Sequence, residues 1–464
     1  MTLTITANVA YASVLLDGEL VAKTDREGHA TLETIPGTFI LRLEKDGYLP
    51  FEESVEVSTT KERLALLERF SYDPSFSSYV WLGEPGRQFN DAEFAGIAEY
   101  DLLVIEKFHA QWDYTVHFEA AVEAKNRNPD ILVLPYLAPK FRYLNDRFGT
   151  ETFDDEWLLY DLDGDPIPFI PAQNQPDGLA IANFTDFSNP DYRAWVVDLV
   201  LEWNEAAPYD GIALDHMTRF AYDFNRAVWD NRLGSEKVDA WNEGLLLLLQ
   251  ETKAALGEDK IVLYNGISRR DRTDDRNLEQ LEYADATLNE VFCVGHGLRR
   301  GLIPNVWSVD ELIEDIDLML TFTDTMLLQK TNYDRNVKGD ERDRFSRFCL
   351  GLYAMGHVPG QTYYKYGHGY NARFEEITAN AQGIDVEFGA PTAEYVYEGG
   401  ILMREYEGGV ILVNPMSPDD EGAGARSVEL DFDVRVLYEP GEREYYRGDE
   451  ILVESHEALF AERI

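Results

Sequence analysis

The feature that most constrains the fold is an alternation of short apolar runs with amphipathic segments between about residues 74 and 385. The apolar runs are strand-like, and segments between them, such as YRAWVVDLVLEWNEA, carry apolar residues at helical spacing. This alternation is typical of βα units around a parallel sheet. Eight apolar runs predict one (β/α)₈ barrel. The expected strands are 78–83, 101–108, 130–137, 210–217, 260–267, 285–292, 324–331 and 352–360.

The two ends of the chain have a different pattern, in which apolar and polar residues alternate with a period of two. Such segments, separated by Asp-Gly, Glu-Gly and Pro-Gly turns, are typical of antiparallel strands. We therefore predict an α/β protein in which a TIM barrel (74–385) lies between a small β-sandwich (1–70) and a C-terminal antiparallel β-domain (386–464). The largest insertion in the barrel runs from Arg142 to Asp191, and loops of that length usually carry a function or cover a site.

The charge of the chain excludes one class of function. Its 464 residues include 86 Asp or Glu and 41 Lys or Arg, for a net charge of -45, which repels a nucleic acid. Lys is the minority of the basic residues, and carboxylates are spread along the whole chain. Molar salt screens such a charge distribution, so we expect a halophilic origin. An unusually acidic mesophilic protein remains the alternative.

The cysteine content and the N-terminal segment indicate the cellular compartment in which the protein acts. Cys293 and Cys349 are too few for a disulfide framework or a four-cysteine metal site, and each lies in an apolar run that predicts a small buried side chain. No run reaches the roughly 18 apolar residues of a transmembrane helix. The first residues alternate like a strand and lack a basic signal-peptide region. We expect action in the cytoplasm, or on a particle assembled there and released by lysis.

Two carboxylates follow predicted strands of the barrel. Asp215 lies near the end of the run DGIALDHM, and Glu290 lies near the end of the run DATLNEVF. These are the fourth and sixth strands, so their C-terminal ends lie two apart in the ring and open into the same mouth, where catalytic residues of such barrels lie. Paired carboxylates cleave acetals, because one protonates the leaving oxygen while the other attacks carbon or activates water. We predict that Asp215 is the nucleophile or charge stabiliser and Glu290 the general acid/base.

A structural role for each carboxylate is the alternative. Asp215 could cap a following helix, and Glu290 could pair with an arginine such as Arg299. Arg299 and Arg300 could also bind an acidic sugar, although a surface ion pair is the favoured interpretation.

Other polar residues near strand ends are candidates for sugar contacts, which require convergent donors, acceptors and aromatic faces. The predicted substrate-binding residues are Glu106, Tyr136, Lys140, His216, Tyr264, Asn265, Lys330 and Gln361, and further mouth candidates are Lys107, His109, Asn332, His357, Trp81, Trp112 and Tyr363. Glu106 is also a rival for the acid role. The segment YDLDGDP lacks the spacing of an EF-hand, so we expect a turn rather than a calcium site and predict no metal.

Several motifs resemble those of glycoside hydrolases, including hypothetical glycosyl hydrolases and the family 114 endo-α-1,4-polygalactosaminidases. The motifs are WLLYDLDGDPIPF, then NPDYRAW, YDGIALDHM and YADATLNEVF. They carry Trp157, Asp161, Asp163, Gly164, Pro166, Asn189, Pro190, Tyr192, Trp195, Tyr209, Asp210, Gly211 and Asp215. The resemblance spans about residues 78–385 and implies a barrel and α-glycosidic chemistry.

The N-terminal segment resembles PEGA and carboxypeptidase-regulatory-like modules, on the sequence GTFILRLEKDGYLPFEESVEV and the hairpin before it. Such modules bind other molecules or act as spacers between domains, and they do not catalyse reactions. We expect an enzyme that cleaves or recognises cell-surface polysaccharide or glycoprotein glycans, a reaction that needs no cofactor. The alternative is an inactive glycan-binding protein, such as a tail component of a virus of halophilic archaea, with other virion proteins or further copies of the chain as partners.

Overall fold

The structure is a computed structural model of the 464-residue chain. It describes residues 1–7, 12–25, 28–44, 51–65, 76–82, 89–105, 114–143, 153–169, 182–219, 226–267, 278–294, 306–322, 324–331, 340–366, 387–417, 424–437 and 443–464. Contacts divide the chain into two compact units, one of Phe76–Asp385 and one of Met1–Ser75 with Val386–Ile464.

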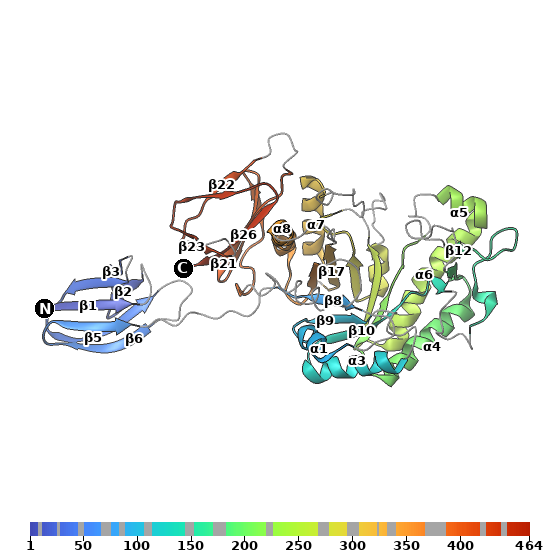
Figure 1. Ribbon diagram of the computed structural model, residues 1–464, viewed down its shortest axis with the longest axis horizontal. Helices are drawn as coiled ribbons and strands as arrows, with labels where there is room; N and C mark the ends of the chain where they lie inside the picture. The colour runs from blue at the N-terminus through green and yellow to red at the C-terminus, as the bar shows by residue number, and fades with distance from the viewer. Residues whose placement is uncertain are drawn as a thin grey trace. The chain divides into compact units, whose positions relative to one another are not determined.

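The first unit contains eight parallel strands in the order of a TIM barrel (Figure 1). The strands are β8 (Tyr79–Leu82), β9 (Leu102–Ile105), β10 (Leu132–Leu137), β14 (Gly211–Leu214), β15 (Ile261–Ile267), β16 (Ala286–Asn289), β17 (Met326–Thr331) and β18 (Thr362–Tyr366). The first and last strands meet at a parallel bridge between Ser78 and Tyr364, supported by a 3.1 Å hydrogen bond from Tyr364 N to Ser77 O. The predicted (β/α)₈ fold is therefore confirmed.

One expected strand is wrong. Residues 352–356 belong to helix α8 (Asp340–Gly356), and the eighth strand is β18, further along the chain. Every residue from Phe348 to His357 is buried, so this part of α8 has no exposed face that would mark a helical period in the sequence. A short apolar run has no period of its own that distinguishes a strand from a buried helix segment, so this part of the sequence was ambiguous.

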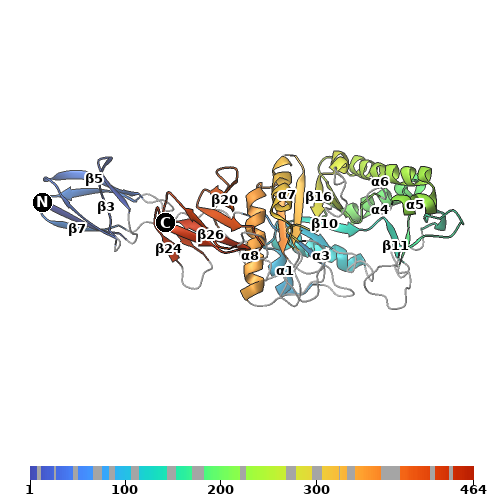
Figure 2. The same cartoon turned by 90° about the horizontal axis from the view of Figure 1, so that it is seen from above.

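Helices cover the outside of the barrel, and their packing follows the chain order. They are α1 (Asp91–Ile97), α3 (Tyr114–Arg127), α4 (Pro190–Ala206), α5 (Arg226–Leu233), α6 (Ser235–Leu256), α7 (Val309–Thr321) and α8, with short 3₁₀ helices at Asp155–Trp157 and Leu278–Tyr283. Figure 2 shows α4 beside α6 and α7 beside α8, pairs that are in contact. Asn189 caps α4 because its side chain accepts the N–H of Asp191 at 2.9 Å, with Pro190 at the first helical position. None of the described helices is long and apolar enough to cross a bilayer.

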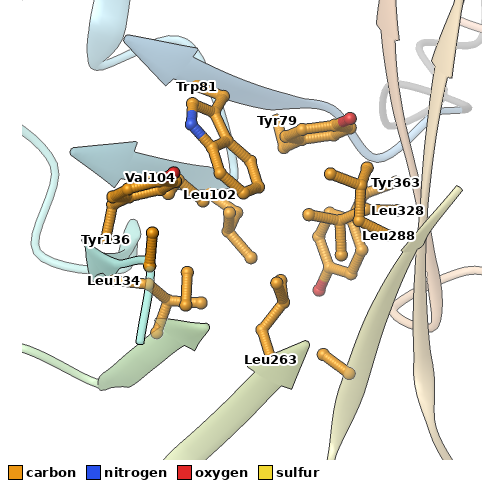
Figure 3. Close-up of a cluster of buried hydrophobic side chains, with 13 residues drawn as sticks. Tyr79, Trp81, Leu102, Val104, Leu134, Tyr136, Leu263, Leu288, Leu328 and Tyr363 are labelled. Carbon is orange, nitrogen blue, oxygen red and sulfur yellow. The ribbon is translucent and has the colours of Figure 1, made fainter. Parts of the chain in front are cut away.

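The barrel interior is filled in layers, as Figure 3 shows for its buried apolar side chains. Because the strands tilt, each layer takes one side chain from every second strand. Following the strand register, the layers from the middle upward are Tyr79, Leu134, Leu263 and Leu328, then Val104, Ala213, Leu288 and Lys365, then Trp81, Tyr136, Asn265 and Lys330. The interior is thus apolar in the middle and becomes polar toward the carboxyl ends of the strands.

The insertion between β10 and α4 builds a small antiparallel sheet. Its strands, in spatial order, are β11 (Phe141–Tyr143), β13 (Ala182–Phe184) and β12 (Pro168–Phe169). Phe141 and Phe169 stack with ring centroids 4.2 Å apart, and Phe184 meets Phe141 edge-on at 5.0 Å. These aromatic contacts hold the sheet together beside the end of β10.

The remaining unit is antiparallel apart from one parallel pair, β1 with β7. The N-terminal strands are β1 (Thr2–Ala7), β2 (Ser13–Leu16), β3 (Glu19–Lys23), β4 (His29–Glu33), β5 (Gly37–Glu44), β6 (Phe51–Val57) and β7 (Lys61–Ala65), in sheets ordered β4-β1-β7 and β3-β2-β5-β6 around one apolar core. The C-terminal strands are β19 (Val396–Glu398), β20 (Ile401–Tyr406), β21 (Gly409–Asn414), β22 (Arg426–Glu429), β23 (Val434–Val436), β24 (Arg443–Tyr445), β25 (Glu450–Val453) and β26 (Glu457–Arg463). They surround a separate core. The expected β-domains at both ends are confirmed as folds, and the division into three domains stays a prediction.

Candidate active site

Asp215 directly follows β14 and faces the inside of the barrel. Ala213, two residues earlier, is part of the interior cluster, and side chains alternate along a strand. The backbone N–H of Asp215 donates to Leu137 O at 2.8 Å, which ties the end of β14 to the end of β10. Asp215 is 8% exposed, so its carboxylate lies at the mouth and is largely shielded from water.

Both oxygens of the Asp215 carboxylate accept hydrogen bonds from neighbouring strands. Asn265 Nδ2, from β15, donates to Oδ1 at 2.7 Å. The hydroxyl of Tyr136, from β10, donates to Oδ2. Asn265 and Tyr136 belong to the layer immediately below, so the floor of the site holds this carboxylate by contacts from both sides. Such donors stabilise a carboxylate in its charged form.

His216 contacts the same carboxylate through both its backbone N–H and its imidazole ring. Its φ of 58° is left-handed, which is uncommon for a residue with a side chain and marks local backbone strain. In this conformation the His216 N–H donates to Asp215 Oδ1 at 2.8 Å, while Nε2 lies 3.2 Å from Oδ2. The ring meets Phe141 edge-on at 4.9 Å, and the side chain is 43% exposed. His216 therefore connects the buried carboxylate to the open mouth.

Glu290 directly follows β16 and faces the same interior, two residues after the interior Leu288. Lys330 Nζ, from β17, lies 3.1 Å from Glu290 Oε1. The Lys330 side chain is 3% exposed and that of Glu290 is 24% exposed. Glu290 is thus the more accessible of the two carboxylates, and it lies in direct contact with a buried cation.

The described contacts of Asp215 are not those of a helix cap. The first described helix after it is α5, which begins at Arg226, and Asp215 accepts from the next residue and from a neighbouring strand. Lys330 is a basic partner of Glu290. Arg299 and Arg300 lie outside the described residues, so the pairing of Glu290 with Arg299 stays an alternative prediction.

Trp81 and Lys365, both buried below the carboxylates, complete the floor together with Tyr136. Trp81 and Tyr136 meet edge-on with ring centroids 5.7 Å apart. Lys365, on β18, is 2% exposed and donates from Nζ to Trp81 O at 2.9 Å. Sequence analysis missed Lys365 because the eighth strand was assigned too early in the chain. The alternation in TYYKY, with apolar Tyr363 facing inward two residues earlier, is the signal that could have found it.

The remaining predicted residues do not all join this site. Lys140 is 4% exposed, donates to Thr218 O at 2.9 Å and lies over the ring of Trp241, so it supports the backbone that follows Asp215. Tyr264 lies between two inward-facing residues of β15 and therefore points out of the barrel. It is buried on that side.

Residues predicted from the misassigned eighth strand lie at the opposite end of the barrel. Gln361 precedes β18, where its carbonyl accepts the N–H of Leu327 at 2.7 Å. His357 is 1% exposed and contacts Thr362 Oγ1 at 2.9 Å. Tyr363 faces inward, with its hydroxyl 3.4 Å from Gly360 O. Glu106, Lys107, His109, Trp112 and Asn332 lie outside the described residues.

The Asp-rich segment between the 3₁₀ helix and β12 forms a turn, as the sequence predicts. Asp161 Oδ1 accepts the N–H groups of Asp163 at 3.1 Å and Asp165 at 3.0 Å. Gly164 has a φ of 87°, which this tight turn requires. Throughout the described ranges, His, Cys, Asp and Glu side chains do not gather into a group of three that suits a metal ion. Cys293 and Cys349 are both buried and unbridged, as expected.

Comparison with known proteins finds several similar solved structures. The chain is similar to the glycoside hydrolase domain of PelA from Pseudomonas aeruginosa, with 14% identity, a TM-score of 0.40, and coverage of 64% of this chain and 99% of that one. It is also similar to an α-amylase from Geobacillus thermoleovorans, with 12% identity, a TM-score of 0.48, and coverage of 85% and 99%. A maltogenic α-amylase from Thermotoga neapolitana is similar as well, with 12% identity, a TM-score of 0.49, and coverage of 84% of this chain and 98% of that one. A search of curated protein sequences finds no match.

Family models match two parts of the chain. The PEGA domain model matches residues 1–68, in agreement with the expected N-terminal module. The model of hypothetical glycosyl hydrolase family 15 matches residues 125–410, a range that includes Asp215, Glu290 and six of the eight barrel strands. Because this match covers more than half of the 464 residues, the chain belongs to hypothetical glycosyl hydrolase family 15.

Proposed function

We propose that this protein is a glycoside hydrolase that cleaves a cell-surface polysaccharide or glycoprotein glycan at the mouth of its barrel, with Asp215 and Glu290 as the catalytic carboxylates. Family membership supports a glycan-cleaving function. The observation that carries the assignment is that two inward-facing carboxylates end strands β14 and β16, which are two apart in the barrel. Strands lie about 4.8 Å apart, so two such strand ends are roughly 10 Å apart, a spacing across which their side chains reach toward one sugar.

The two carboxylates have different surroundings, which suggests different roles. Asp215 accepts hydrogen bonds from Tyr136, Asn265 and His216, so it suits the role of an anion that attacks or stabilises the anomeric carbon. Glu290 is more exposed and suits proton transfer. In the reaction, Glu290 gives its proton to the glycosidic oxygen as the bond to the anomeric carbon breaks. A water molecule then supplies the oxygen that bonds to that carbon, and its proton passes to a carboxylate.

Four of the predicted substrate-binding residues surround these carboxylates: Tyr136, His216, Asn265 and Lys330. His216 is the most exposed of them, so we propose that its imidazole contacts a sugar hydroxyl. The Phe141 ring beside it supplies an apolar surface of the kind that packs against a sugar ring.

The test is release of reducing sugar from a panel of envelope polysaccharides, glycoprotein glycans and polygalactosamine, in molar potassium chloride because of the charge of -45. Wild type is compared with Asp215→Asn and Glu290→Gln, each expected to lower turnover by at least about 1,000-fold. Asp285→Asn is the matched control, because Asp285 precedes the same strand as Glu290 but accepts the N–H of Val262 at 2.8 Å at the opposite end of the barrel. This variant should keep its turnover.

A binding-only protein is the second candidate, and the same experiment separates it. Wild type that binds a glycan in this panel without releasing sugar, and whose binding survives both substitutions, contradicts the hydrolase assignment. It favours a glycan-recognising role in which the N-terminal module presents the barrel to a surface.

A further inference from the structure

Two lysines are buried inside the barrel of this strongly acidic chain. Lys330 and Lys365 are register partners on neighbouring strands β17 and β18, face inward and are each 2% exposed. Their contacts differ. Lys330 Nζ lies 3.1 Å from Glu290 Oε1, whereas Lys365 Nζ donates to a backbone carbonyl, Trp81 O, at 2.9 Å. Only the first of these described contacts joins a lysine to a proposed catalytic carboxylate.

The charged and titratable groups placed around Glu290 by the described part of the chain come from four strands. Lys330 faces it from β17, with Lys365 behind on β18, and Asp215 ends β14 across the barrel. Tyr79 comes from β8. Burial raises the pKa of its phenol, and the negative charge of Glu290 raises that pKa further. Among these described groups, Lys330 is the cation in contact with the carboxylate.

A cation at this distance affects which form of Glu290 is stable. An opposite charge within about 4 Å favours the ionised carboxylate and lowers its pKa by about 1–3 units, and the effect is strongest where water is excluded. The general acid of a glycosidase more often has a raised pKa, set by an apolar pocket. Lys330 therefore acts on Glu290 in the opposite direction from that usual arrangement.

We propose that Lys330 is a positioning residue that fixes Oε1 of Glu290 and keeps this carboxyl ionised until the solution is acidic, so that hydrolysis is fastest at acidic pH. The inference rests on the proposed role of Glu290 as the acid/base group. It gives Lys330 a role exerted through Glu290 instead of a direct sugar contact.

The first test is the pH dependence of kcat/KM for wild type, Lys330→Gln, Lys330→Arg and Lys253→Gln. Lys330→Gln removes the charge and retains a donor, and it should move the alkaline limb upward by about 1 pH unit or more. Lys330→Arg should restore the wild-type limb. Lys253→Gln removes a lysine whose Nζ lies 2.8 Å from Asp285 Oδ1, at the opposite end of the barrel, and should leave the limb in place. An unmoved limb in Lys330→Gln, with only KM changed, overturns the proposal and indicates a sugar contact.

A second measurement does not require turnover. Carbon-13 NMR of the glutamate side-chain carboxyl groups follows Glu290 directly, with its signal assigned by its loss in Glu290→Gln. We expect a titration midpoint below the ordinary value of about 4.3 in wild type, and a higher midpoint in Lys330→Gln. The same midpoint in both proteins overturns the inference even where the enzyme is active. A shifted midpoint in a protein that releases no sugar leaves the inference about Lys330 standing and contradicts the proposed hydrolase.

Discussion

Asn265 donates its side-chain N–H to Asp215 at 2.7 Å, from one barrel strand to the end of the next. On the other side, Tyr136 donates its hydroxyl to the second oxygen of the same carboxylate. The two donors come from the layer directly beneath Asp215, so the barrel helps to orient this carboxylate together with the N–H of His216.

Removing either donor should lower the rate of hydrolysis. We expect Tyr136→Phe and Asn265→Ala to reduce kcat/KM by about 10- to 100-fold, equivalent to ~1.5–3 kcal/mol for a hydrogen bond to a charged group. Tyr363→Phe is the matched control, since Tyr363 faces inward at the opposite end of the barrel with its hydroxyl 3.4 Å from Gly360 O. Equal losses in Tyr136→Phe and Tyr363→Phe would show that the effect is general to the barrel core.

Lys140 is expected to contribute to stability. Its ammonium donates to Thr218 O at 2.9 Å and to Thr218 Oγ1 at 3.1 Å, and it lies 5.3 Å from the ring centroid of Trp241. Lys140→Met leaves the Thr218 carbonyl without this donor, so unfolding should become easier by about 1–3 kcal/mol. Urea unfolding followed by fluorescence measures the change. Lys61→Met, at an exposed lysine that donates to Glu56 O at 2.7 Å, should change stability by less than about 0.5 kcal/mol. A Lys140→Met midpoint equal to wild type contradicts this role.

Replacing Gly244 with alanine should destabilise the protein, although the same change inside a helix usually stabilises it. Gly→Ala in a helix interior normally stabilises a protein by about 0.5–1 kcal/mol. In α6, however, a Cβ at position 244 would lie 2.1 Å from Phe187 O and 2.4 Å from Phe187 C. Gly244→Ala must therefore separate α6 from the segment before α4, and we expect a destabilisation of about 2–4 kcal/mol.

The control for this substitution is Gly257→Ala, just after the same helix. Nothing lies within 4 Å of the added Cβ, and only the φ of 83° opposes the change. A φ of 83° with a ψ of −179° is essentially confined to glycine, so the expected cost is about 1–3 kcal/mol. Thermal unfolding of the two variants gives the order of the two effects, and a Gly244→Ala protein more stable than wild type would contradict the close approach.

Buried tyrosines should make the protein sensitive to alkali. Burial raises the pKa of Tyr79, Tyr100, Tyr192, Tyr209 and Tyr406 above the ordinary 10.0. The folded protein keeps these phenols protonated where the unfolded chain loses the protons, so stability is unaffected below pH 10 and falls as pH rises above it. The loss is about 1.4 kcal/mol per pH unit for each such group. Urea midpoints at pH 8, 10 and 11, with tyrosinate absorbance recorded in parallel, test this. Tyrosinate formation by these groups without unfolding would contradict it.

The carboxylates at the strand ends could be predicted from the sequence because their position follows from simple alternation. A run of apolar residues that ends in Asp215 or Glu290 determines both the strand and the side of the barrel that its last residue faces. The contact partners could not be predicted in this way. That Lys330 meets Glu290, and that Asn265 and Tyr136 meet Asp215, depends on register between strands far apart in the chain, which a single sequence does not specify.

The eighth strand shows where local patterns fail. The run around Tyr353 is apolar enough for either a buried helix or a strand. In the folded protein it is helical and packs against α7. The error moved Gln361 and His357 to the wrong end of the barrel and hid Lys365. The left-handed conformation of His216 was also unpredictable, because nothing in the sequence marks it and it is stabilised by contacts that form only in the folded protein.

The seam between β8 and β18 also sets the order of events during synthesis. It joins residues far apart in the chain: Lys365 donates to Trp81 O across 284 positions, and Tyr353 donates to Ser77 O across 276. Closing so long a loop brings no local contacts to offset its entropy until both ends are present. The barrel of a nascent chain therefore cannot close before Tyr366 has left the ribosomal exit tunnel. Until then β8 lacks the strand that pairs with it in the folded protein, and an unpaired strand edge is able to pair with another copy.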